Sequence, residues 1–241
     1  EISYEDCINN YGSTNYLNTS DKLIREVTNI IKKVKISKDD ALISFSKEFD
    51  KTEFNSSKEF KFHKKDFKKA YESLDHKIIN NLEFLRERII KFHSEKSING
   101  WKAEDSAFNE YGQIVRPIKR VGLYAPGGTA TYPSSVLMTA VLANIAGVEE
   151  ILLSFPPSSN EVTDLMLASC HIGGVTEAVS IGGAQAIAAM TFGTESIKKV
   201  DKIFGPGNKY VAEAKRQVYG IVGIDSFTGP SEVMIIADES A

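Results

Sequence analysis

"DKIFGPGNKYVAEAKRQV", residues 201–218, is the stretch on which the fold prediction depends. A short apolar run ends in Gly-Pro-Gly-Asn, and the chain then takes on the charged pattern of an amphipathic helix. A simple turn needs one glycine or one proline, whereas Gly205, Pro206 and Gly207 all precede Asn208 here. Our hypothesis is that a ligand approaches the backbone at this turn, because glycine permits such an approach.

The same alternation of strand and helix runs through the second half of the chain. Strand and helix candidates follow one another as "RVGLYAP", "PSSVLMTAVLANIAG", "EEILLSF", "SNEVTDLMLASCHIGG", "EAVSI", "GGAQAIAAMTFG" and "VDKIF", and "VMIIAD" is a further strand candidate near the end. This rhythm predicts an α/β fold, a parallel sheet with helices on both faces. In such sheets, ligands bind outside the carboxyl ends of the strands.

The first half has a different composition and is predicted to be mainly helical. Most of the 17 glycines and 7 prolines follow the boundary that we place between residues 119 and 120, and most of the basic residues precede it. Ser20, Ser37 and Asp75 each stand before an amphipathic run, where they can cap a helix. Trp101 is expected to anchor the link between the two halves.

The overall composition is that of an ordinary globular protein, with 241 residues, 42% hydrophobic and 25% charged, and a net charge of −3. This balance gives no attraction to nucleic acid or to an anionic membrane, and no apolar run is long enough to span a bilayer. Cys7 and Cys170 form no disulfide framework, which fits a reducing compartment, and we interpret Cys170 as a core residue. The four histidines lack metal-ligand spacing, so no metal site is expected within this chain.

Three glycine-rich loops are predicted at the carboxyl edge of the sheet. They are "YAPGGTATYPSS" with Tyr124, "IGGAQAIAA" with Gln185, and the Gly-Pro-Gly-Asn turn with Asn208. Any one of them alone is more simply a turn between strand and helix, and Asn208 is a good helix cap whatever binds nearby. Three at one edge favour a ligand, because helix N-termini present free N–H groups that suit phosphate. The G-x-G-x-x-G fingerprint and the Walker A lysine are both missing, so nucleoside triphosphate chemistry is not expected.

Together the segments "RVGLYAPGGTATYPSSVLMTAVLANIAGV", "SIGGAQAIAAMTFGTESIKKVDKIFGPGNKYVAEAKRQV" and "GPSEVMIIAD" resemble the histidinol dehydrogenases. The upstream "DDALISFSKEFDKTEF" is similar to that family's N-terminal region. The resemblance implies a Rossmann-like fold and the oxidation of L-histidinol to L-histidine through the aldehyde, the last step of histidine biosynthesis, with NAD as oxidant. It also implies a cytoplasmic homodimer, NAD contacts from Tyr124, Gln185 and Asn208, and a contact between Ser231 and the substrate histidinol.

The same resemblance divides the chain into three parts. Residues 1–119 are expected to be a mainly helical region of the family's first large domain, and residues 120–232 an incomplete variant of the Rossmann-like NAD-binding domain. Residues 233–241 are expected to begin a truncated return into the first domain. The family's zinc ligands and its Glu-His proton-transfer pair come from segments beyond the position of Ala241. We therefore expect a fragment that has neither catalytic nor metal-binding residues and is inactive alone.

Two alternatives stay open at this point. An enzyme related to the aldehyde dehydrogenases needs a catalytic cysteine in an extended loop, and neither Cys7 nor Cys170 fits that role. A non-catalytic nucleotide-binding or dimerisation module would have the same fold without the chemistry. A continuation of the coding sequence with a Gln-x-x-His segment would decide for a fragment of the enzyme.

Overall fold

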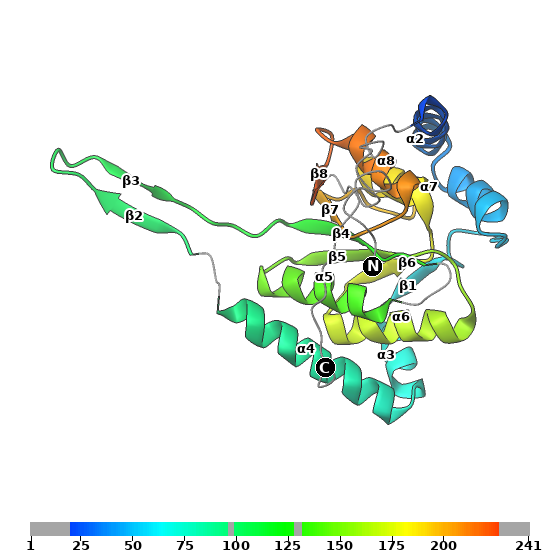
Figure 1. Cartoon of the computed structure of the whole chain (residues 1–241), viewed down its shortest axis with the longest axis horizontal. Coiled ribbons are helices and arrows are strands. Elements are labelled where there is room, and N and C mark those ends of the chain that lie inside the picture. Colours follow the sequence, from blue (N-terminus) through cyan, green and yellow to red (C-terminus); the bar gives the residue numbers. More distant parts are fainter. Residues whose placement is uncertain (1–19, 96–98, 128–131, 227–241) are drawn as a thin grey trace, which may run out of the picture.

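Four of the apolar runs predicted as strands are neighbours in one six-stranded sheet of the computed structural model, which describes residues 20–95, 99–127 and 132–226. The strand order is β1-β6-β5-β4-β7-β8 (Figure 1). The strands are β1 (Lys61–His63), β4 (Arg120–Tyr124), β5 (Glu150–Ser154), β6 (Glu177–Val179), β7 (Lys202–Phe204) and β8 (Gly223–Ile224). The strand candidate "VMIIAD" lies outside the described residues.

The chain winds the sheet outward in two directions from β4. It first adds β5 and β6 on one side, then crosses back to add β7 and β8 on the other, and all four of these pairings are parallel. The strand order therefore reverses between β4 and β7, as it does in dinucleotide-binding folds. Within this sheet of the described residues, β1, from the first half of the chain, is the one strand that pairs antiparallel, against β6. The predicted α/β fold with a Rossmann-like parallel sheet is confirmed.

Helices cover both faces of the sheet (Figure 1). One face carries α5 and α6, with α3 and α4 packed outside them, and the other carries α7 and α8, with α2 against both. The bounds are α2 (Asp21–Phe49), α3 (Lys64–Ser73), α4 (His76–Ser94), α5 (Pro133–Ile145), α6 (Asn160–Gly173), α7 (Gly183–Phe192) and α8 (Lys209–Val218). None of the helices in the described ranges is both long and apolar enough to cross a membrane.

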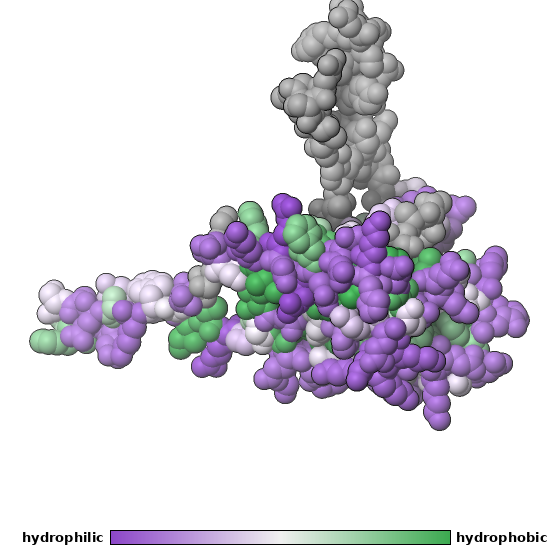
Figure 2. Space-filling view, turned by 90° about the horizontal axis from the view of Figure 1, so that it is seen from below, coloured by the Kyte–Doolittle hydropathy of each residue, from purple (hydrophilic) through white to green (hydrophobic). Residues whose placement is uncertain are grey.

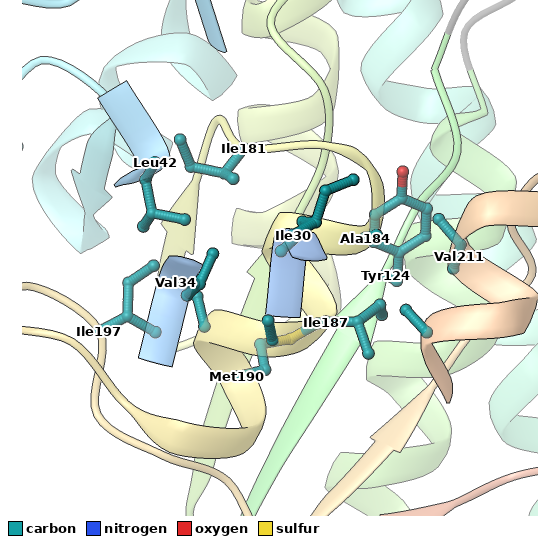
Figure 3. Packing of buried hydrophobic residues seen from close by; sticks show 14 of the residues in the cluster. Ile30, Val34, Leu42, Tyr124, Ile181, Ala184, Ile187, Met190, Ile197 and Val211 are labelled. Carbon is teal, nitrogen blue, oxygen red and sulfur yellow. The ribbon is translucent and has the colours of Figure 1, made fainter. Parts of the chain in front are cut away.

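Each face of the sheet has its own hydrophobic cluster, and each cluster joins the two halves of the sequence. On the α7 face, Ile30 and Val34 of α2 lie over Ile187 and Met190 of α7 (Figure 3). On the other face, Phe67 of α3 shares a cluster with the residues of α5 and α6. The helices before residue 120 and the sheet after it therefore share their cores.

The predicted helix starts are largely where the sequence places them. The hydroxyl of Ser20 accepts a hydrogen bond from the Leu23 N–H, and the carboxylate of Asp75 accepts one from the Lys77 N–H. The two helices expected to begin after Ser20 and Ser37 run together as α2, with a break at Lys38, where φ is 49° and ψ is −121°.

A long hairpin stands out from the body of the molecule (Figures 1 and 2). It consists of antiparallel strands β2 (Trp101–Glu104) and β3 (Glu110–Gln113). The expectation that Trp101 anchors the two halves is wrong, because Trp101 lies on this hairpin, is 54% exposed, and packs edge-on against Tyr111 with 6.0 Å between ring centroids. The hairpin therefore draws little stability from the core of the described residues.

The amino edge of the sheet is held together by charge. Arg120, at the start of β4, has a side chain only 5% exposed, and it forms ion pairs with Glu150 of β5, at 2.7 Å, and with Glu177 of β6. Its backbone N–H donates to the carboxylate of Asp201, just before β7, at 3.1 Å. Lys61 of β1 adds an ion pair to Glu177 at 3.3 Å. This network fixes the starts of five strands relative to one another.

We predict that Arg120→Met destabilises the protein by about 3 kcal/mol, because it leaves two partly buried carboxylates without their shared cation. Denaturant unfolding of the variant and the parent chain measures this difference. The matched control is Lys198→Met, which removes an exposed cation from the same Glu150. The control is expected to cost less than about 1 kcal/mol, and equal losses from the two variants would contradict the assigned role of burial.

Candidate functional site

A cavity of about 930 Å³ opens at the carboxyl edge of the sheet, where the strand order reverses between β4 and β7. Open α/β sheets bind their ligands at this position, and the volume is within the range of cofactor sites. Tyr124, Gln185 and Asn208, the three residues that the sequence singled out on separate loops, all line this one cavity. The opposite wall comes from α2, through residues that include Phe49 and Asp50.

Tyr124 is the last residue of β4 and is buried at the base of the cavity. Its phenolic oxygen accepts a hydrogen bond from the Gly183 N–H at 3.0 Å. Burial raises the pKa of Tyr124 to about 12, and the negative charge of Asp50 adds to the rise. The phenol therefore keeps its proton at neutral pH, so it can donate a hydrogen bond to a ligand.

Gln185 lies in the first turn of α7, and the preceding glycine shapes its position. Gly183 has φ +65°, and a Cβ atom there would lie 2.6 Å from Oε1 of Gln185, so the carboxamide occupies the space that a side chain at Gly183 would need. Gln185 is only 2% exposed, and its carboxamide forms no hydrogen bond with a described residue. Because Gln185 also lines the cavity, its carboxamide is placed to form a hydrogen bond with a ligand there.

The two Gly-Gly loops pack around Pro156, which follows β5. A Cβ atom at Gly127 would lie 3.0 Å from the Pro156 ring, and one at Gly182 would lie 2.8 Å from it. Pro156 and Pro157 follow β5 and line the cavity. The loops after β4, β5 and β6 therefore form one packed rim, for which small residues are required.

The opening hypothesis about the Gly-Pro-Gly-Asn turn needs a correction. Gly205 has φ +117°, and a Cβ atom there would lie 2.1 Å from the carbonyl oxygen of Tyr124. A Cβ atom at Gly207 would lie 2.4 Å from the Val211 side chain. Both glycines therefore make room for the protein's own chain. Their effect on the site is indirect, since they bring the end of β7 close against Tyr124.

Asn208 caps α8 through its side-chain oxygen, and its side-chain NH2 group is available to a ligand in the cavity. Its Oδ1 accepts hydrogen bonds from the N–H groups of Tyr210 and Val211, at 3.0 and 3.1 Å. The Nδ2 group donates to none of the described residues. Behind the turn, the buried Lys215 donates to the Gly205 carbonyl at 3.0 Å and forms an ion pair with Asp225. Lys215 therefore fixes the turn from the core side, and Asn208 lines the cavity on the other side.

The wall from α2 was not found in the sequence analysis, and it contains an unusual carboxylate. Asp50 caps the end of α2, and its Oδ2 is buried without a hydrogen-bond partner among the described residues. Burial raises the pKa of Asp50 from 3.8 to about 6. Nearby, Glu26 accepts a hydrogen bond from the Tyr210 hydroxyl at 3.2 Å, which joins α2 to the first turn of α8. The cavity is thus closed by contacts between opposite ends of the chain.

Comparison with known proteins agrees with this geometry. The family model described as "Histidinol dehydrogenase" matches residues 14–241. The chain belongs to the histidinol dehydrogenase family.

Among curated family members, the histidinol dehydrogenase of Listeria innocua is 42% identical over 98% of this chain and 55% of its own length. That of Staphylococcus epidermidis is 43% identical over 100% of this chain and 56% of its own length. The crystal structure of histidinol dehydrogenase from Elizabethkingia anophelis superposes with a TM-score of 0.81 at 35% identity, over 88% of this chain and 49% of that one. The chain therefore spans about half the length of these histidinol dehydrogenases.

Two expectations about histidinol dehydrogenase residues remain to be placed. Ser231 lies outside the described residues, so its contact with the substrate stays a prediction. Cys170 is fully buried and burial raises its pKa far above the ordinary value, as expected for a core residue and not for a nucleophile. Within the described ranges, no three His, Cys, Asp or Glu residues are grouped so as to hold a metal ion.

We predict that Asp50→Asn stabilises the chain at pH 8 but not at pH 4. Because the folded state raises the pKa of Asp50, it binds a proton more tightly than the unfolded state, and stability falls as pH rises from 3.8 through about 6. The full shift would correspond to about 3 kcal/mol, which we reduce to roughly 1–2 kcal/mol because the carboxyl group is partly exposed. Denaturant unfolding at both pH values measures the difference, and a loss of stability at pH 8 would contradict it.

Proposed function

We propose that this chain forms the NAD side of a zinc-dependent histidinol dehydrogenase, which oxidises L-histidinol to L-histidine through the aldehyde. The observation that carries the proposal is the convergence of Tyr124, Gln185 and Asn208 on one cavity at the switch point of the sheet, in a chain that belongs to this family. As the chain spans about half of its relatives' length, the whole reaction is assigned to a longer protein of which this is a part.

The cavity fits NAD in its shape and in its unpaired polar groups. The buried carboxamide of Gln185, the phenol of Tyr124 and the free amide of Asn208 offer hydrogen bonds that the described residues do not use. The N-termini of α7 and α8 open at the same edge, where their N–H groups and positive dipole ends favour a pyrophosphate. A cavity with unused hydrogen-bonding groups, bounded by two helix ends, is a suitable environment for a dinucleotide.

In the proposed reaction, NAD accepts the hydride that leaves the substrate carbon. The role proposed for this chain is to bind NAD and to orient it. Tyr124 keeps its proton and donates a hydrogen bond from the base of the cavity, and Gln185 and Asn208 supply amide groups from two further strand ends. Because the loops are packed on glycine and proline, these groups are held in place before the cofactor arrives, which reduces the entropy lost on binding.

The zinc site and the proton-transfer residues are not assigned to the described residues, which offer no suitable cluster. We propose that they belong to the part of the relatives' length that this chain does not span, together with most of the contacts to histidinol. The cytoplasmic location and the homodimer belong to the same proposal and are supported by family membership alone.

We predict that Asn208→Asp weakens NAD binding by about 1–3 kcal/mol, because the amide donor is lost and a charge is placed beside the pyrophosphate. The aspartate keeps an oxygen for the two N–H groups of α8, so the melting temperature is expected to change little. Calorimetric titration with NAD and a thermal melt measure the two effects. Normal NAD affinity in this variant would show that Asn208 serves only as a helix cap.

We predict that the 241-residue chain alone oxidises no histidinol and holds far less than one zinc per molecule, whereas a protein extended to the length of its relatives does both. The measurements are NADH formation with histidinol, and metal analysis after removal of any affinity tag. Comparable rates from the two proteins, or stoichiometric zinc in the shorter one, would show that the catalytic residues have been placed wrongly.

A further inference from the structure

The fold leaves a buried carboxylate oxygen beside the cavity without a partner among the described residues. Within the described ranges, the buried side-chain polar atoms without a hydrogen-bond partner are Oδ2 of Asp50 and the hydroxyl oxygen of Ser46, one turn away on α2. Asp50 lines the cavity, so the cavity is the side from which a partner can reach its carboxyl group. Since native proteins pair nearly all such atoms, this carboxylate indicates a ligand group.

The cation that lines the cavity and the cation next to Asp50 in sequence both interact with other groups. Lys33 lines the cavity, but its ammonium group donates to the Ser44 hydroxyl at 3.2 Å and lies 4.7 Å from the centre of the Phe45 ring. Lys51 donates to the backbone carbonyl of Glu48 at 2.7 Å. The described residues therefore give Asp50 no ion pair, and the group that it recognises must bring its own donors. Hydroxyl groups suit this role, whereas a phosphate is repelled.

An aromatic ring stands beside the carboxylate. Phe49 lines the cavity and is 46% exposed, although it is a large apolar residue. It is stacked on the buried Phe45, with ring centroids 5.2 Å apart and planes 8° from parallel. This support holds the Phe49 ring in a fixed orientation, and an exposed aromatic ring is a suitable surface for a planar base.

We propose that Phe49 and Asp50 form a nucleoside subsite, in which Asp50 accepts hydrogen bonds from the hydroxyls of one NAD ribose and Phe49 stacks on the base attached to it. The inference rests on the proposed NAD site. In other dinucleotide-binding folds, an acidic residue accepts ribose hydroxyls for the same chemical reason. Here the acid comes from a helix that precedes the sheet in sequence, which explains why no strand-end motif revealed it.

The test is equilibrium binding of NAD, AMP and nicotinamide mononucleotide to the chain and to its Asp50→Asn variant. The variant is expected to bind NAD about tenfold more weakly, through loss of a charge-assisted hydrogen bond. Binding of either AMP or nicotinamide mononucleotide should weaken by a similar factor, and binding of the other should weaken by less than about twofold. The half that responds shows whether the adenosine or the nicotinamide ribose occupies the subsite.

The matched control is Glu53→Gln, which removes the same charge three residues away, at an exposed position outside the cavity. It is expected to leave all three affinities within about twofold. Unchanged or tighter NAD binding by Asp50→Asn would overturn the subsite while leaving the NAD site standing, since a carboxylate that merely repels phosphate gives tighter binding when neutralised. Absence of NAD binding by the parent chain would overturn the proposed function and the subsite together. A thermal melt checks that the Asp50→Asn variant is folded. If that variant does not fold, Asp50→Ser is used in its place.

Discussion

The registration of the parallel strands depends on a charge that is buried at their starting edge. Arg120 reaches from β4 to carboxylates on β5 and β6, and its backbone is tied to the segment before β7. Buried ion pairs add little net stability compared with apolar packing, but they penalise alternative pairings strongly, because a displaced partner leaves a charge without compensation. The ion pairs at one edge of the sheet thus determine which loops meet at the other edge, where the cavity lies.

The loops at the carboxyl edge are held in a different way, through close packing at glycines, which have no side chain. Gly205 lets the end of β7 approach the Tyr124 carbonyl, and Gly127 and Gly182 let two loops close around Pro156. These contacts place a phenol and two amides at fixed positions and leave their hydrogen-bonding groups unused. A site of this kind needs little reorganisation to accept a ligand.

Local sequence patterns predicted strands β4 to β7, most helix starts and three residues of the cavity, because all of these depend on neighbours in sequence. The patterns could not reveal Asp50, whose importance arises from burial against loops more than 70 residues later. They also missed β1, a strand of three residues inside a lysine-rich segment, and misplaced Trp101, whose hairpin has exposed residues on both faces and so lacks the alternation that marks a strand. The purpose assigned to Gly205 and Gly207 was wrong because sequence shows where space is needed and not what fills it.

The position of α2 also has a consequence for synthesis of the chain. This helix leaves the ribosome early, but the surfaces against which it packs, α7 and α8, are made more than 130 residues after the helix begins. Until then the apolar stripe that includes Val27, Ile30 and Val34 has no place in the core. A nascent chain that stops before α7 therefore leaves the apolar face of α2 uncovered, and such exposed surface is prone to aggregation. The wall that α2 contributes to the cavity can be completed only after α7 and α8 have been made.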